Sequence, residues 1–145
     1  MDEHPSTGRL EDLDTAACLE LLDRAPVGRV AFVEDDVPVI VPVNFTVDDG
    51  EIVIRVAGGS GLARNQGALV AFEVDDVKEW ARAGGSVLVV GRACAISDPP
   101  REARLRRTFQ PWAGGRRDVL IGIPMDRITG RQVPAEPAEV TGQPI

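Results

Sequence analysis

The sequence predicts a mainly β protein with helices, an α+β domain built as a six-stranded antiparallel barrel, closed or nearly closed, with short helices beside it. Three observations predict this class. Apolar residues alternate with a period of two along most of the chain, Asp- and Gly-rich turns separate these runs, and helical spacing is confined to three short segments. The 145 residues are the usual size of one domain with a single core.

The first part of the chain predicts a helix followed by a three-stranded meander. Asp12 can cap a helix over residues 12–24, which Pro26 ends. The three strands, joined by tight polar turns, are expected over residues 27–33, 37–47 and 51–57. The second strand is apolar at every other position, which predicts one core-facing side formed by Val37, Val39, Val41, Val43, Phe45 and Val47.

The remainder predicts two more helices and three more strands. A short helix over residues 62–66 follows a run of glycines, and another begins at Asp98, with Pro99 at its first position. The strands are expected over residues 68–74, 86–96 and 118–123. The domain organisation is a flexible N-terminal tail at 1–10, a folded domain at 11–132 and a disordered C-terminal tail at 133–145.

The charge of the chain limits its partners. The formal net charge of −7 repels nucleic acid and anionic membranes, so neither is an expected partner. No run approaches the ~20 apolar residues that a membrane-spanning helix needs. The polar N-terminus lacks the apolar core of a signal peptide, and a cytoplasmic location is therefore expected.

The histidine and cysteine content excludes several kinds of chemistry. The single histidine, His4, lies in the polar N-terminal segment, so a histidine metal site or a Ser–His–Asp triad is not expected. Cys18 and Cys94 lie far apart without a CxxC pattern, which favours two buried thiols and leaves a disulfide open. No catalytic residue and no metal ligand is assigned.

A glycine-rich turn is the first candidate for a binding site. The strand that contains Arg55 and Val56 runs into the segment 58–62, GGSGL, where a helix begins. Free amide N–H groups at a helix start, together with a hydroxyl and a nearby guanidinium, can bind an anion. An ordinary flexible turn beside a solvated arginine explains the same residues.

A proline inside an otherwise regular strand is the second candidate. Pro42, within Val41-Pro42-Val43-Asn44, lacks an N–H group and therefore marks a sheet edge or a bulge. Neighbouring backbone groups would then be free to bond a planar heterocycle. Simple protection of a sheet edge explains the proline equally well.

Charged segments elsewhere are weaker candidates. The arginine-rich helix at 101–107, with Arg116 and Arg117 near Trp112, indicates a solvated face or salt bridges across a dimer, because the acidic total argues against nucleic acid. The acidic residues at 73–76 have no histidine or metal-ligand pattern beside them and receive no catalytic role.

Six motifs in a fixed order resemble those of one known family. They are LDxxxCLxLLxxxxVGRVAF (13–32), PVxVPVNF (38–45), IVIRVAGGSG (52–61), VAFEVDD (70–76), SVLVVGRA (86–93) and ITGR (128–131). This order resembles the pyridoxamine 5′-phosphate oxidase-like flavin and deazaflavin oxidoreductases, in their small actinobacterial-type branch. The resemblance covers about residues 10–131.

The resemblance implies a split β-barrel of the FMN-binding type that forms a homodimer, with two cofactor sites at the subunit interface. The cofactor-binding residues that it implies are Val41, Pro42, Val43, Asn44, Arg55, Val56, Ser60, Gly61, Leu62 and Trp112. The first four would lie along the isoalloxazine ring, the arginine and the turn would hold the phosphate, and the tryptophan region would approach from the partner subunit. In such proteins the flavin carries the hydride chemistry on a small-molecule substrate.

Four positions depart from the family pattern. Relatives commonly carry lysine at the position of Gly61, tryptophan at that of Gly85, and basic residues at those of Val90 and Gly122. Losing the lysine removes a point charge from the phosphate site, whereas Arg55 can still contact a phosphate with two N–H groups. One charge-assisted hydrogen bond contributes roughly 1.5–3 kcal/mol, so its loss implies about ten- to a hundred-fold weaker binding.

Three functions are open at this point. The first is an FMN-binding oxidoreductase that acts on an unidentified small molecule. The second is a non-catalytic module that binds or sequesters FMN, a deazaflavin cofactor or a tetrapyrrole. The third is a barrel without a cofactor that serves as a dimeric scaffold.

Overall fold

The structure is a computed structural model, and it describes residues 9–135. Its strands are β1 (Glu11–Leu13), β2 (Val27–Glu34), β3 (Val37–Asn44), β4 (Thr46–Asp48), β5 (Glu51–Val56), β6 (Ala68–Lys78), β7 (Ala83–Ala95), β8 (Val119–Pro124) and β9 (Arg127–Val133). Its helices are α1 (Thr15–Arg24), α2 (Gly61–Arg64), the 3₁₀ helix η1 (Glu79–Ala81) and α3 (Pro99–Thr108). The predicted tails fall largely on residues 1–8 and 136–145, outside the described part of the chain.

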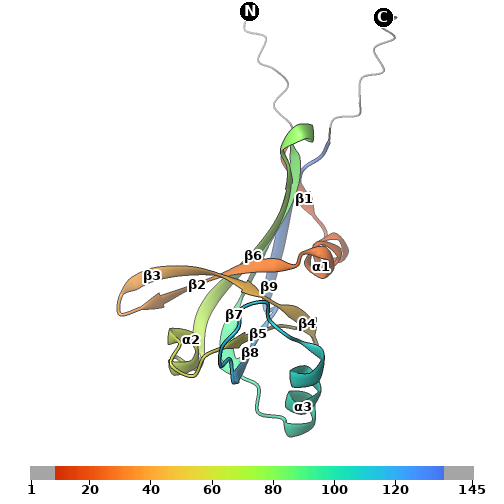
Figure 1. Ribbon diagram of the computed structural model, residues 1–145. Helices are drawn as coiled ribbons and strands as arrows, with labels where there is room; N and C mark the ends of the chain where they lie inside the picture. Colours follow the sequence, from red (N-terminus) through yellow and green to blue (C-terminus); the bar gives the residue numbers. More distant parts are fainter. Residues whose placement is uncertain (1–8, 136–145) are drawn as a thin grey trace, which may run out of the picture.

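The antiparallel sheet curls into a barrel, from which the β2–β3 and β6–β7 hairpins extend in different directions (Figure 1). The strand order is β3-β2-β6-β7-β8-β5-β4, while β9 pairs with β7 and β1 pairs with β9. The two end strands of this path, β3 and β4, are consecutive in sequence and flank Phe45. The Phe45 ring packs edge-on against Phe72 with 4.8 Å between ring centroids, so this corner closes the barrel over its core.

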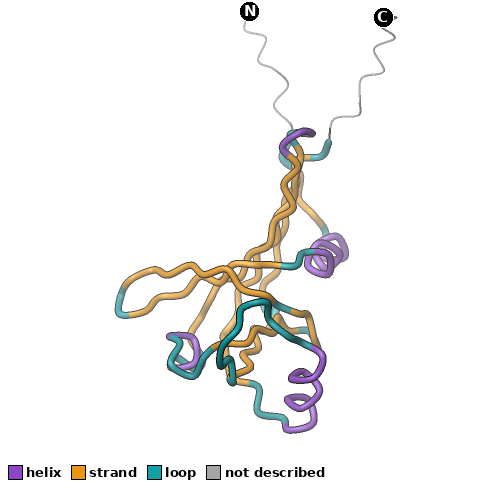
Figure 2. Tube along the Cα trace, in the orientation of Figure 1, coloured by secondary structure: helices purple, strands orange, loops and turns teal. Residues whose placement is uncertain are grey.

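The barrel is split where β7 changes partner. Residues 84–90 of β7 pair with β9, and its end pairs with β8 at Cys94 and Ala95. Gly91 lies between the two registers, where a Cβ atom would lie 2.1 Å from the Pro124 carbonyl oxygen. This close approach of two backbones requires glycine. The predominance of strands, visible in Figure 2, confirms the predicted mainly β class with short helices.

Two apolar cores stabilise the fold. The larger one fills the barrel and is centred on fully buried side chains from β2, β5, β6, β7 and β8, including Val30, Ile52, Ile54, Phe72, Val74, Val87, Val89, Ile121 and Ile123. The smaller one lies between α3 and the opposite side of β5 and β8, and consists of Val53, Ile96, Leu105, Phe109 and Leu120. Strand β5 is therefore buried on both sides, which fixes the end of the strand where the glycine-rich turn begins.

The number of strands differs from the prediction. Between residues 9 and 135, nine strands replace the six expected, because the segment 37–47 divides at Phe45 and because β1 and β9 were not anticipated. The hairpin formed by β6 and β7 is also longer than predicted, since both strands continue through the glycine-rich connection. A Cβ atom at Gly84 would lie 2.8 Å from the Asp76 carbonyl oxygen, so this glycine belongs to a close strand pair and not to a loop.

The first helix begins later than predicted. Asp14, not Asp12, is its N-cap, and the Asp14 carboxylate accepts a hydrogen bond from the Ala17 N–H at 2.8 Å. Asp12 instead lies in β1 opposite Arg131 of β9. Both aspartates precede the apolar helical pattern, and only the pairing of β1 with the distant strand β9 selects between them.

The expected core-facing side of the segment 37–47 is wrong at both ends. Val37 is 58% exposed and Val47 is 36% exposed, because β3 extends beyond the barrel and β4 is an end strand.

Cys94 is exposed, contrary to the expectation of two buried thiols, since its side chain points to the outer face of β7. Cys18 is buried, and both cysteines are free thiols. Burial raises the pKa of the Cys18 thiol, with a further contribution from Asp14.

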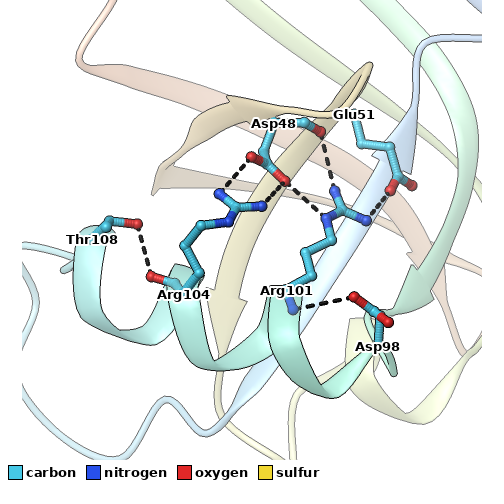
Figure 3. Close-up of polar contacts among 6 residues, drawn as sticks. All are labelled: Asp48, Glu51, Asp98, Arg101, Arg104 and Thr108. Carbon is cyan, nitrogen blue, oxygen red and sulfur yellow. Dashed lines mark hydrogen bonds and ion pairs between the residues drawn. The ribbon is translucent and has the colours of Figure 1, made fainter.

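An ion-pair network joins α3 to the β4–β5 hairpin (Figure 3). Asp98 caps α3, as predicted, and accepts a hydrogen bond from the Arg101 N–H at 3.1 Å. The Arg101 guanidinium contacts Asp48 at 2.8 Å and Glu51 at 2.6 Å, and Arg104 contacts Asp48 at 2.9 Å. These basic residues of the helix therefore pair within the chain.

No helix in the described residues is long and apolar enough to cross a membrane.

Candidate functional site

The strand segment predicted to contact a heterocycle lies at an edge of the sheet. Within residues 9–135, β3 pairs with β2 alone, so its second edge carries backbone groups that no strand uses. The side chains of Val41 and Val43 are half-buried against the main core, whereas Pro42 is exposed opposite Arg29. The prediction that Pro42 marks an edge is confirmed. What this segment presents to a ligand is therefore backbone and a proline ring.

The structure brings Asn44 and Trp112 together. The Asn44 Oδ1 atom accepts a hydrogen bond from the Trp112 backbone N–H at 2.7 Å, and Asn44 Nδ2 donates to the Pro26 carbonyl at 3.3 Å. The indole side chain is 75% exposed. Asn44 thus fixes the loop after α3 against the barrel corner and leaves the Trp112 ring outside.

Arg55 organises the same loop from the other side. Its Nε donates to the Arg117 carbonyl at 3.2 Å, and its Nη1 donates to the Phe109 carbonyl at 3.0 Å. Nη1 also lies 3.4 Å from Gln110 Oε1. Within residues 9–135 the remaining nitrogen, Nη2, donates no hydrogen bond, so it is available to a ligand.

The glycine-rich turn is exposed at its first two glycines. A Cβ atom added at Gly58 or Gly59 would meet no atom within 4 Å. Ser60 caps α2, and its Oγ accepts a hydrogen bond from the Leu62 N–H at 3.2 Å. Val56 and Leu62 are buried in the main core, so they position the turn and contribute their backbone to it.

Arg117 is a candidate that the sequence analysis did not assign to this site. Val119 is paired with Val56, so the chain just before Val119 runs beside the turn that follows Val56. Within residues 9–135, the Arg117 Nε is a buried side-chain nitrogen without a hydrogen-bond partner. An unpaired buried donor is costly unless a ligand or water satisfies it. Its sequence signal, two adjacent arginines before a strand, is too common to have identified it.

Gly61 lies under a carboxylate. A Cβ atom at this position would lie 2.5 Å from Glu34 Oε2 and 3.0 Å from the Phe32 ring. The other oxygen of this carboxylate, Oε1, accepts a hydrogen bond from Arg64. Glu34 therefore occupies the space that a lysine side chain at position 61 would enter.

The other three departures from the family pattern have separate structural correlates. A Cβ atom at Gly85 would lie 3.0 Å from Leu21 of α1, and one at Gly122 would lie 2.8 Å from the Glu51 carboxylate. Val90 lies on the outer face of the sheet, in an apolar hollow of about 340 Å³ formed by β2, β3, β6 and β7. None of these three residues contributes a cation.

Paired carboxylates lie farther along the outer face of the sheet. Arg29 contacts Glu73 at 3.4 Å and Asp75 at 3.1 Å. Burial and the neighbouring Asp75 raise the pKa of Glu73. Glu73 and Asp75 border a second cavity of about 490 Å³, which Arg82 and Arg131 also line. No group of three potential metal-ligating side chains occurs within residues 9–135.

The resulting class is a split β-barrel in which the loop after α3 contacts Asn44 at the open strand edge and Arg55 in the strand before the glycine-rich turn. The chain belongs to the pyridoxamine 5′-phosphate oxidase family, whose sequence profile matches residues 14–142. The family resemblance carried by the six sequence motifs is thereby confirmed.

Individual relatives agree with this assignment. The uncharacterised protein Rv0080 of Mycobacterium tuberculosis is 33% identical over 137 residues, which are 90% of each chain. The FAD binding protein from Mycobacterium smegmatis is 28% identical with a TM-score of 0.71, over 84% of this chain and 97% of that one. A Corynebacterium diphtheriae protein of unknown function is 25% identical with a TM-score of 0.72, over 86% and 98%. These structures confirm the split-barrel fold.

Proposed function

We propose that this protein binds FMN and acts as an oxidoreductase on a small molecule. The observation that carries the proposal is the open turn at Gly58 and Gly59, which directly follows the strand that contains Arg55. Arg55 donates to the Arg117 carbonyl, and within residues 9–135 the buried Arg117 Nε has no hydrogen-bond partner. Two guanidinium groups, a serine hydroxyl and backbone amides form a donor set that fits a phosphate. The FAD binding protein of M. smegmatis, a relative with the same fold, supports a flavin as the ligand.

The proposed site has two parts. Arg55, Ser60 and the amides of Gly61 and Leu62 hold the phosphate, with Val56 fixing the end of the strand. The backbone at the free edge of β3, from Val41 to Asn44, supports the isoalloxazine ring. A bound flavin supplies hydride chemistry, and the chain supplies its position and its electrostatic surroundings. Here the local donors work against a chain whose formal net charge is −7.

We also propose that the protein is a homodimer with a cofactor site at each interface. The apolar hollow on the outer face of the sheet is bordered by Val33, Ile40 and Leu69, all more than half exposed. Exposed apolar patches of this kind are typical of protein interfaces. A second copy of the chain would bury this face, and the exposed Trp112 ring would then reach the partner's site.

The test of the cofactor is a titration followed by absorbance and flavin fluorescence. FMN, FAD, riboflavin and a deazaflavin cofactor are each added to the full chain. Saturable micromolar FMN binding that Arg55→Ala weakens about ten- to a hundred-fold, with Arg107→Ala as the exposed control, supports the proposal. If the protein binds FAD or the deazaflavin cofactor more tightly than FMN, that ligand takes the place of FMN as the proposed cofactor. A protein that ignores all four ligands would overturn the proposal.

The dimer is tested by light scattering at micromolar concentration. The expected mass is twice 15.5 kDa. Ile40→Asp places a charge in the exposed patch and is expected to give a folded monomer, whereas Glu79→Gln, on the tip of the β6–β7 hairpin, leaves the patch unchanged. A monomeric wild-type chain would contradict the proposal.

A further inference from the structure

The space beside Gly61 is filled by an acid from another strand. A Cβ atom at position 61 would lie 2.5 Å from Glu34 Oε2 and 2.7 Å from Glu34 Cδ. Gly61 is not among the residues with positive φ, so its backbone conformation would accept any L-residue. The contact with Glu34, and not backbone geometry, therefore distinguishes this position.

Arg64 holds the same carboxylate from its other side. The Arg64 Nη2 atom donates to Glu34 Oε1, while Oε2 faces Gly61. The Arg64 N–H donates to the Ser60 carbonyl at 3.1 Å, which places this arginine one turn after the serine of the proposed phosphate site. The Glu34 carboxylate therefore lies between the Arg64 guanidinium and position 61, where relatives commonly carry a lysine.

The arginine is free to change its partner. Its side chain is 59% exposed, whereas that of Glu34 is 27% exposed. The pair with Glu34 is a surface ion pair, and such pairs contribute little to stability. A phosphate offers a guanidinium two oxygens in bidentate geometry and more charge than a carboxylate, so it competes well for Arg64.

We propose that Arg64 replaces the missing lysine as a phosphate-binding cation, and that Glu34 holds it near the turn until the phosphate displaces the carboxylate. This inference rests on the proposed flavin site. It assigns opposite roles to the two partners of one ion pair. Arg64 strengthens the binding of a phosphorylated cofactor, and Glu34 weakens it, both by occupying Arg64 and by placing a negative charge beside the anion.

The experiment compares FMN with riboflavin, which has the same ring and no phosphate, on the full chain. Arg64→Gln is expected to weaken FMN binding about ten- to a hundred-fold. Glu34→Gln is expected to tighten it about two- to fivefold. Riboflavin affinity should stay within about twofold of the wild type in both variants, because its ring contacts lie elsewhere. Arg107→Gln, which removes the same charge from the exposed side of α3, is the matched control.

A rescue variant separates a direct phosphate contact from a loss of folding. Gly61→Lys in the Arg64→Gln background restores a cation to the turn, since only the flexible end of Glu34 and the Phe32 ring edge must move. Recovery of FMN affinity supports the inference. Equal FMN affinities for Arg64→Gln and Arg107→Gln would overturn it and leave the flavin site standing. A wild-type chain that binds neither FMN nor riboflavin would remove the flavin site and this inference together.

Discussion

Arg101 of α3 and Asp48 of the β4–β5 hairpin form a partly buried ion pair, with 2.8 Å between Arg101 Nε and Asp48 Oδ2 (Figure 3). The Arg101 side chain is 15% exposed, and it also donates to the Asp48 carbonyl at 3.1 Å. One guanidinium therefore holds the helix and the hairpin together at the edge of the smaller core.

Arg101→Met is expected to lower the free energy of unfolding by about 2–3 kcal/mol, because it removes the guanidinium that Glu51 contacts and one of the two that Asp48 contacts. Urea unfolding followed by circular dichroism measures this loss. Arg107→Met, at an exposed position of the same helix, is the control and should stay within about 0.5 kcal/mol. Equal unfolding midpoints for the two variants would show that the network does not stabilise the fold.

The Asp48 carboxyl is expected to make stability depend on acid pH. The hydrogen bond from Arg104, followed by that from Arg101, lowers the pKa of Asp48 against the opposing effect of burial. A carboxyl with a lowered pKa in the folded state stabilises that state above its unfolded pKa, and this contribution is lost as the pH falls through the folded value. The stability difference between wild type and Asp48→Asn should therefore be full at pH 7 and shrink below about pH 4. A difference that stays constant down to pH 2 would exclude this linkage.

Glu73 is expected to make stability depend on pH in the direction opposite to that of Asp48. Burial, followed by repulsion from Asp75, raises its pKa, so the folded state favours the protonated form. Stability linked to this group is present below the unfolded pKa and is lost as the pH rises through the folded value. Glu73→Gln should stabilise the protein at pH 7 by less than about 1 kcal/mol, since the side chain is partly exposed, and should have no effect below about pH 4. Thermal melts at the two pH values test this, and destabilisation at pH 7 would show that the contact with Arg29 dominates.

Gly91→Ala is expected to be among the most damaging small substitutions. The added Cβ would lie 2.1 Å from the Pro124 carbonyl oxygen, where β7 changes partner, and neither backbone can move without disturbing the sheet. A loss of about 2–3 kcal/mol is expected in urea unfolding. Gly114→Ala adds the same atom in open space and should change stability by less than about 0.5 kcal/mol. Similar effects in the two variants would contradict the tight crossing.

Asn44→Ala is expected to release the loop after α3. The variant removes the acceptor of the 2.7 Å hydrogen bond from the Trp112 N–H and the donor to Pro26. Hydrogen exchange at the Trp112 amide should become faster, with a loss of about 1 kcal/mol in overall stability. Asn44→Asp keeps an acceptor and should retain most of the protection. Unchanged exchange in Asn44→Ala would show that other contacts hold this loop.

Local patterns in the sequence were sufficient for much of the fold. Alternation of apolar residues located β2, β5, β7 and β8, and the aspartate and prolines at residues 98–100 located α3. Pro42 indicated an edge strand because a residue without an N–H cannot sit in the middle of a sheet. The family motifs correctly identified the split barrel, although their implied cofactor contacts remain predictions.

Such local patterns could not predict contacts between residues that are far apart in the chain. Short segments such as β1 and β9 carry little periodicity, so their pairing is decided by the strands beside them. The choice of Asp14 over Asp12 as a helix cap follows from that pairing. Cys94 is exposed because the smaller core does not cover the face of β7 on which its side chain lies.

The sequence by itself determined the class of the protein, because alternation, capping and turn chemistry act between residues close in the chain. It also determined which residue types the glycine-rich turn contains. Only the tertiary structure decided which charges lie beside that turn: Glu34 comes from β2, lies against Gly61 and pairs with Arg64. These groups meet because the barrel closes, and closure depends on contacts between residues far apart in the chain, which no local pattern encodes.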